Sequence, residues 1–189
     1  DNNPDLLNTP DGTFNLCTMT MQPHRREDLI TKITRYAPDP NNRPQYFPDF
    51  LSKISKGRED LEDAHRRFCG SGASGRTPKD GIAIAPGEGA NGKSVFYGAV
   101  ADCLGSYSRP ISIQSLQVEK RSNSHSDDLA SLNKVRFAYS GENNQGVRLD
   151  EGRVKMLTGG DSISVSHKHG RTFQMTPCFS LVIHTNSKP

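Results

Sequence analysis

The sequence predicts an α/β fold with a parallel central sheet, preceded by a small mixed or helical N-terminal region. The first observation is the short apolar run at residues 82–85, which is typical of a buried strand. A glycine-rich turn and a helical pattern at Lys93–Leu104 follow it directly. The second observation is a pair of further apolar runs at residues 135–139 and 179–184. Strands that alternate with helical patterns favour a parallel sheet.

The first 75 residues have a different character. Residues 1–43 are rich in Asn, Asp, Pro and Thr, and we expect a β and loop region with short strands at 12–16 and 29–35. Residues 44–75 carry apolar side chains at helical spacing and end in a stretch of Gly, Ser and Ala. We therefore predict a collar-like helical segment followed by a flexible glycine-rich linker over residues 70–75.

The remaining residues, 76–189, are predicted to form the α/β domain. Gly105 is expected to end the first helix of this domain, and residues 151–157 are expected to form a second, short helix. The chain starts at Asp1 and stops at Pro189. We expect both ends to be cut from a longer protein, with the domain truncated at its C-terminal side.

Composition excludes several classes of protein. The net charge of +3 permits nucleic-acid binding without requiring it. The cysteines are far apart and form no CxxC pair, which argues against a zinc site or a disulfide framework: Cys17, Cys69, Cys103 and Cys178. No apolar run reaches transmembrane length and no signal peptide is visible, so we expect an intracellular protein without a membrane partner.

The glycine-rich turn matches the phosphate-loop pattern G-x-x-x-x-G-K-S. Its members are Gly87, Glu88, Gly89, Ala90, Asn91, Gly92, Lys93 and Ser94. Glycines let backbone N–H groups converge on phosphate oxygens at a helix N-terminus, while Lys93 reaches the β- and γ-phosphates and Ser94 binds Mg²⁺. The pattern predicts a P-loop NTPase that binds ATP and Mg²⁺; a glycine-rich turn with an incidental lysine is the alternative.

Four ordered segments resemble the superfamily 3 helicases of phage and plasmid primase–helicases and their poxvirus-type relatives. They are residues 86–94, 128–142, 149–161 and 181–189, and residues 11–16 are similar to the domain that precedes the helicase in this family. The resemblance implies an AAA+-like ATPase core. The region in which the family carries its arginine finger lies beyond residue 189.

Two further site residues follow from strand ends and from the resemblance. Glu142 follows the second predicted strand, and Asn186 ends the third, at the edge where an open α/β sheet presents its ligand-binding residues. As the Walker B acid, Glu142 would hold Mg²⁺ and orient the attacking water, and Asn186 would be a sensor for the γ-phosphate. A solvated glutamate and a plain turn asparagine are the alternatives.

A hairpin is predicted by the period-two alternation of residues 162–166 and 172–176. Its tip carries Lys168, His169 and Arg171, and no acidic residue follows Asp161. Such a tip could bind DNA backbone phosphates without base-specific contacts, although an ordinary hydrophilic hairpin tip explains the pattern equally well. The resemblance favours DNA. His167 and His169 are expected to be solvated, without a carboxylate partner.

These observations predict an ATP-binding and ATP-hydrolysing DNA helicase domain of viral, phage or plasmid DNA replication. The resemblance implies a ring motor, hexameric in the full-length form, in which each site needs an arginine from the neighbouring subunit. We therefore expect weak or absent turnover from these 189 residues alone. Two alternatives stay open: a P-loop kinase acting on a nucleotide or small metabolite, and a non-catalytic nucleotide-binding fragment.

Overall fold

The computed structural model describes residues 3–39, 41–42, 44–76, 82–87, 91–118, 125–140 and 148–185 of the chain. In order, the elements are β1 (Leu6–Thr9), β2 (Gly12–Asn15), β3 (Thr20–Gln22), the 3₁₀ helix η1 (Arg26–Asp28), α1 (Phe47–Ile54), α2 (Glu59–Ala73), β4 (Ile82–Pro86), α3 (Lys93–Leu104), η2 (Gly105–Tyr107), β5 (Ser108–Pro110), η3 (Ile113–Leu116), α4 (His125–Ala130), β6 (Phe137–Ser140), α5 (Glu151–Thr158), β7 (Ile163–Ser166), β8 (Thr172–Met175) and β9 (Ser180–Thr185).

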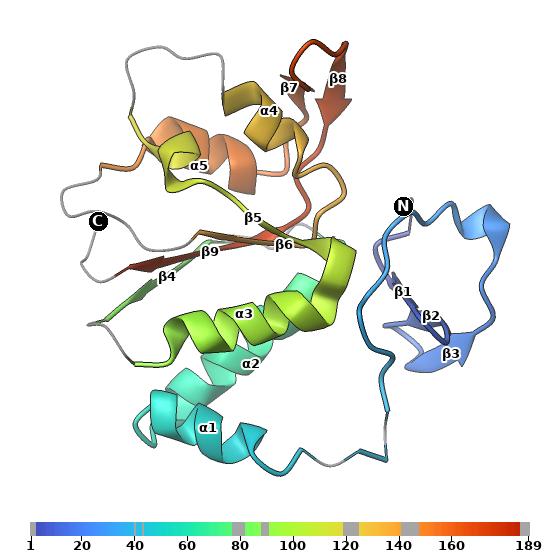
Figure 1. The fold of residues 1–189 in the computed structure, drawn as a ribbon, viewed down its shortest axis with the longest axis vertical. Helices are drawn as coiled ribbons and strands as arrows, with labels where there is room; N and C mark the ends of the chain where they lie inside the picture. The colour runs from blue at the N-terminus through green and yellow to red at the C-terminus, as the bar shows by residue number, and fades with distance from the viewer. Residues whose placement is uncertain are drawn as a thin grey trace.

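A four-stranded parallel sheet lies at the centre, in the order β4-β9-β6-β5 (Figure 1). The last strand in the sequence, β9, lies between β4 and β6, and all six of its residues are buried. A strand covered on both faces needs apolar side chains in both orientations, which explains the three consecutive apolar residues at its centre, Leu181, Val182 and Ile183. The predicted parallel sheet is therefore confirmed.

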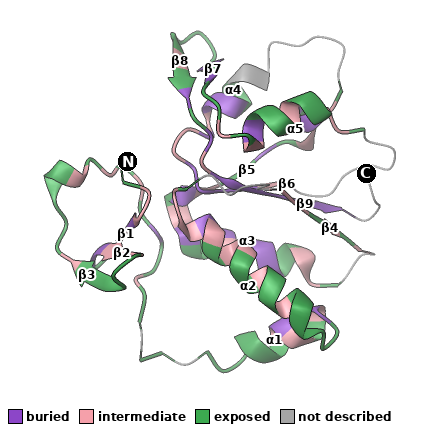
Figure 2. Ribbon diagram, turned by 180° about the vertical axis from the view of Figure 1, so that it is seen from behind, coloured by how far each residue is buried: buried purple, intermediate pink, exposed green. Residues whose placement is uncertain are grey.

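Helices cover both faces of this sheet (Figure 2). On one face, α1, α2 and α3 pack against Val182 and Phe137. On the other, α4, α5 and the β7–β8 hairpin pack against Leu181, Ile183 and Ala138. Successive residues of a strand point to opposite faces, so one short strand supplies both apolar cores.

The helix that follows the glycine-rich turn has the predicted bounds, Lys93–Leu104, and Gly105 ends it at a φ of 56°. The second predicted helix is also present, as α5, which begins where the side chain of Asp150 accepts a hydrogen bond from the Arg153 backbone. No helix among the described residues is long and apolar enough to cross a membrane.

The N-terminal region contains a three-stranded antiparallel sheet, β1-β2-β3. The strand expected at residues 29–35 is absent, and this prediction is wrong. Leu29 has a left-handed backbone at a φ of 49°, which ends η1. The following backbone donors bond to two different elements, since Thr34 donates to the Asn8 carbonyl at 2.9 Å and Arg35 to the Cys103 carbonyl at 3.1 Å. These residues therefore tie the N-terminal sheet to α3 instead of extending it.

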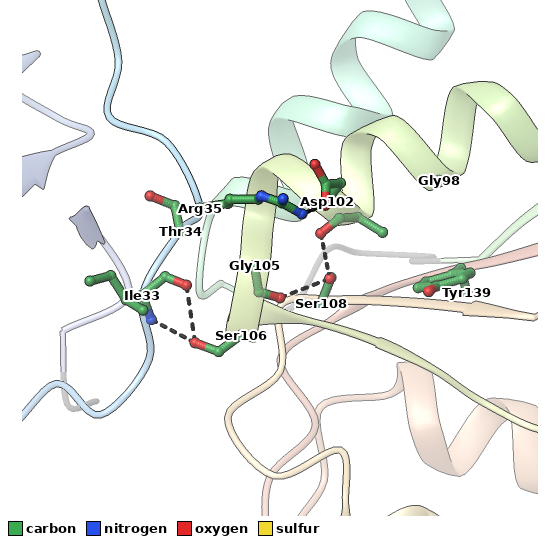
Figure 3. A pocket seen from close by; sticks show the side chains of 10 residues that line it. Ile33, Thr34, Arg35, Gly98, Asp102, Gly105, Ser106, Ser108 and Tyr139 are labelled. Atoms are coloured by element: carbon green, nitrogen blue, oxygen red, sulfur yellow. Dashed lines mark hydrogen bonds and ion pairs between the residues drawn. The ribbon is translucent and has the colours of Figure 1, made fainter. Parts of the chain in front are cut away.

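A cavity of about 440 Å³ marks this junction (Figure 3). On one side, the Ser106 hydroxyl accepts from the Ile33 backbone at 2.7 Å and donates to the Ile33 carbonyl at 3.0 Å. On the other, Arg35 forms an exposed ion pair with Asp102. Both contacts join the N-terminal region to the C-terminal end of α3.

The glycine-rich stretch at residues 70–75 was expected to be a linker, and the structure corrects this interpretation. Residues up to Ala73 belong to α2. A β-carbon on Gly72 would lie 2.8 Å from Cδ2 of Phe137, and the Ser71 hydroxyl lies 2.7 Å from that of Ser180. Small residues are present here because the helix approaches the sheet closely, so α2 packs directly on the α/β core.

Candidate functional site

The carboxyl ends of β4, β6 and β9 meet at one edge of the sheet, because the three strands are parallel neighbours. Pro86 pairs with Thr185, and Ser140 pairs with Ile183. Beyond β4, the Gly87 backbone donates to the Thr185 carbonyl at 3.0 Å. The turn after β4 therefore starts beside the end of β9, at the edge where open α/β sheets bind ligands.

The ammonium group of Lys93 donates hydrogen bonds to two residues of the glycine-rich turn. Lys93 Nζ donates to the Gly87 carbonyl and to Oδ1 of Asn91, the latter at 2.9 Å. Asn91 Oδ1 also accepts from the Lys93 backbone at 3.4 Å. Ser94 is exposed one residue further on, in the first turn of α3. Asn91 thus holds the Lys93 side chain, a role that the generic motif does not require.

The two motif glycines in the described part of the loop differ in what a β-carbon would meet, a flexible exposed side chain at Gly87 and a packed helix at Gly92. A β-carbon on Gly87 would lie 2.3 Å from Nδ2 of Asn91. Gly92 has a φ of 83° at the N-cap of α3, and a β-carbon there would lie 3.0 Å from Cγ2 of Ile54 in α1. The left-handed backbone of Gly92 and the close approach of Ile54 both disfavour a larger residue at this position.

Several predicted site residues lie outside the described residues, and their roles stay predictions: Glu88, Gly89, Ala90, Glu142 and Asn186. The structure does describe the strands that precede them. β6 ends at Ser140 and β9 ends at Thr185, at the same edge as Gly87.

The predicted hairpin is present as β7 and β8, with Ser166 paired to Thr172. Lys168, His169 and Arg171 are exposed at its tip, and His169 has a left-handed backbone at a φ of 61°. Exposure of these three residues fits both a hydrophilic surface turn and a contact with DNA, so their role in DNA binding stays a prediction.

A carboxylate partner for His167 corrects the expectation that this histidine is merely solvated. Oδ1 of Asp127, in α4, lies 3.1 Å from His167 Nδ1 and accepts from the Lys168 backbone at 3.1 Å. The Lys168 backbone bond, followed by the His167 bond, lowers the pKa of Asp127. The contact joins the hairpin to α4 across 40 residues of sequence, and no local pattern signals it.

His184 occupies a different environment, deep in β9. It is 6% exposed, and its ring stacks on Tyr97 with centroids 6.1 Å apart. Among the described residues, no group of three or more His, Cys, Asp or Glu side chains is placed to hold a metal ion.

Residues 86–189 match a protein family described as a family of unknown function, DUF5906. The chain belongs to this family. Residues 1–56 of this DUF5906 chain also match a second family, described as D5 N terminal like.

The DUF5906 chain is 25% identical over 195 residues to a protein of Acanthamoeba polyphaga mimivirus named "Putative helicase L207/L206". That similarity covers the whole chain but only 20% of the mimivirus protein. The chain therefore spans about a fifth of this relative's length.

Two solved structures share the fold. The NrS-1 C terminal region matches with a TM-score of 0.62 at 10% identity, over 82% of this chain and 37% of that one. A JCV helicase matches with a TM-score of 0.51 at 13% identity, over 78% of this chain and 42% of the helicase. The DUF5906 chain thus has a mixed α/β, helicase-like fold.

Proposed function

We propose that this chain is the nucleotide-binding part of an ATP-dependent DNA helicase of superfamily 3, used in viral, phage or plasmid DNA replication. The observation that carries the proposal is the turn between β4 and α3. It places the Lys93 ammonium against the Gly87 carbonyl, directly after the left-handed Gly92, at the carboxyl edge of a parallel sheet. The likeness in fold to helicases and the mimivirus relative support it.

The loop residues fit a triphosphate. The described acceptors of the Lys93 ammonium are two neutral oxygens, which anionic phosphate oxygens can replace with stronger charge-assisted bonds. Because Gly87 has no side chain, the Asn91 amide and the Lys93 ammonium lie close to its backbone, where a β-carbon would be 2.3 Å from Asn91 Nδ2 and 3.3 Å from Lys93 Nζ. The N-terminus of α3 adds its positive dipole end.

Within the proposed ATPase, the predicted site residues divide the work of binding and hydrolysing the nucleotide. Lys93 would bind the β- and γ-phosphates, and Ser94 and Glu142 would hold Mg²⁺, which would supply positive charge beside the transferred phosphoryl group. Glu142 also orients the attacking water, and Asn186 contacts the γ-phosphate. A neighbouring subunit of a hexameric ring supplies an arginine.

The hairpin is the proposed DNA contact. Lys168, His169 and Arg171 are exposed at its tip, and Asp127 anchors the turn through the Lys168 backbone. Binding to backbone phosphates is independent of sequence and weakens with salt. We expect Lys168→Ala with Arg171→Ala to weaken DNA binding in an assembled ring and to leave nucleotide affinity unchanged. If fluorescence anisotropy gave the double variant the same DNA affinity as the wild type, the DNA would have to bind elsewhere.

The nucleotide site is tested by titrating wild type and Lys93→Ala with a fluorescent ATP analogue and Mg²⁺. Loss of a charge-assisted bond costs about 1.5–3 kcal/mol, so affinity should fall by about 10- to 150-fold. Lys155→Ala is the matched control, since Lys155 is exposed on α5, on the opposite face of the sheet. Equal affinities of the wild type and Lys93→Ala would contradict the assignment.

A further inference from the structure

A second cavity, of about 420 Å³, lies beside the phosphate loop. Its volume is within the range of about 300–1,000 Å³ that is typical of small-molecule sites. The α2 helix contributes Leu61, Ala64 and Phe68 to one wall, and α3 contributes Tyr97. At the loop end, the lining is Asn91 and Lys93. One continuous space therefore joins an apolar and aromatic slot to the proposed triphosphate site.

The apolar wall is fixed in position relative to the loop. A β-carbon on Gly92 would lie 3.0 Å from Ile54 and 3.4 Å from the ring of Phe50, and both residues belong to α1. The α1 helix therefore packs directly on this loop glycine. The α1–α2 pair also packs on the sheet through Gly72, as described above. The distance between the slot and the loop is thus set by packed elements of the fold.

The slot has the chemistry that a nucleobase needs. A base has two apolar π-faces, which stack on aromatic and apolar side chains, and a polar edge that exchanges hydrogen bonds. Phe68 and Tyr97 supply aromatic surface. The neutral Tyr97 hydroxyl can both donate and accept a hydrogen bond, and burial raises its pKa further, to about 12.

We propose that this cavity receives the base of the nucleotide whose phosphates bind the loop at residues 87–94. The inference rests on the proposed nucleotide site, because the two sites share Asn91 and Lys93. It gives α2 a part in ligand binding, although α2 precedes the phosphate loop in the sequence and lies outside the motif.

The test compares ATP with inorganic triphosphate, which carries the phosphates without a base. Both affinities are measured by calorimetry with Mg²⁺ for the wild type, for Ala64→Trp and for Ala99→Trp. Ala64 is exposed on α2 and lines the cavity, so a tryptophan fills the slot without entering the core. Ala99 is an equally exposed alanine on α3 that does not line this cavity, and it provides the matched control.

We expect Ala64→Trp to lose ATP affinity by about tenfold or more, as for the removal of one stacked base, and to keep the triphosphate affinity of the wild type. Ala99→Trp should bind both ligands as the wild type does. Unchanged ATP affinity in Ala64→Trp, or an equal loss of both ligands in it, would overturn the base site while leaving the phosphate site standing. If the wild type bound neither ligand, the proposed nucleotide site itself would be wrong.

Discussion

Arg136 is a buried cation that joins three parts of the chain, and its replacement should destabilise the fold strongly. The residue is 2% exposed, directly before β6. Its guanidinium donates to the Ala73 carbonyl at 2.8 Å and to the Leu6 carbonyl at 2.6 Å, and lies 4.5 Å from the ring centroid of Tyr107. Burial lowers the pKa of Arg136, which shows that the site is costly for a charge.

The magnitude follows from the two carbonyls. Ala73 is the last residue of α2, where a carbonyl lacks a partner within the helix, and Leu6 lies in the edge strand β1. Arg136→Met keeps most of the apolar stem but removes both donors. Each buried carbonyl left without a donor costs about 1–3 kcal/mol, and relief of the desolvated charge offsets part of the loss. We expect the free energy of unfolding to fall by about 2–4 kcal/mol.

Urea unfolding followed by circular dichroism measures this change, with Arg35→Met as the control. Arg35 forms its ion pair with Asp102 at the surface, where the two side chains are 60% and 47% exposed. Such pairs contribute about 0–1 kcal/mol, so the control should change little. If Arg136→Met were as stable as Arg35→Met, the assignment of Arg136 as the link between the N-terminal sheet, α2 and β6 would be refuted.

Two further predictions concern α2. Gly72→Ala should destabilise the fold by about 1–3 kcal/mol, because its β-carbon would lie 2.8 Å from the Phe137 ring. Gly70→Ala lies in the same helix, with nothing within 4 Å of its β-carbon, and should be neutral or up to about 1 kcal/mol stabilising. Thermal melts of both variants measure the difference, and equal changes in stability would contradict the close packing of Gly72 on Phe137. Burial raises the pKa of the Cys69 thiol to about 12, so at pH 8 about one thiol in 10⁴ is ionised, and exposed Cys17 should react much faster with a maleimide. Mass spectrometry of labelled peptides measures both rates, and comparable rates would show that α2 is not packed on the sheet.

The elements that the sequence predicted well are those with a strong local pattern. The helix Lys93–Leu104 begins directly after the motif and ends at a glycine, and the hairpin alternates in period two. Apolar runs predicted the parallel strands because β6 and β9 lie between two helical layers, whereas β4, at the edge of the sheet, is only half-buried. In these places, the local sequence and the tertiary environment favour the same structure.

The errors arose where distant contacts decide the structure. Gly and Ser in residues 70–73 have the composition of a linker, although they belong to α2, and the position of Phe137 explains why residue 72 is a glycine. The Asp127–His167 pair joins residues 40 positions apart. In the candidate site, the motif predicted Lys93 and its glycines, whereas the cavity lined by α2 depends on tertiary packing that no spacing reveals.

The central claim is that the loop at residues 87–94 binds the phosphates of a nucleotide. Backbone amide chemical shifts, recorded while Mg²⁺–ATP is added to the protein, test it most directly, because phosphate oxygens accept from these N–H groups. We predict that the largest shifts occur at Gly92, Lys93 and Ser94, and that the Lys93→Ala variant needs far more ATP to reach them. If the chemical shifts changed only in other parts of the chain at saturating ATP, and those of these three amides stayed the same, the claim would be contradicted.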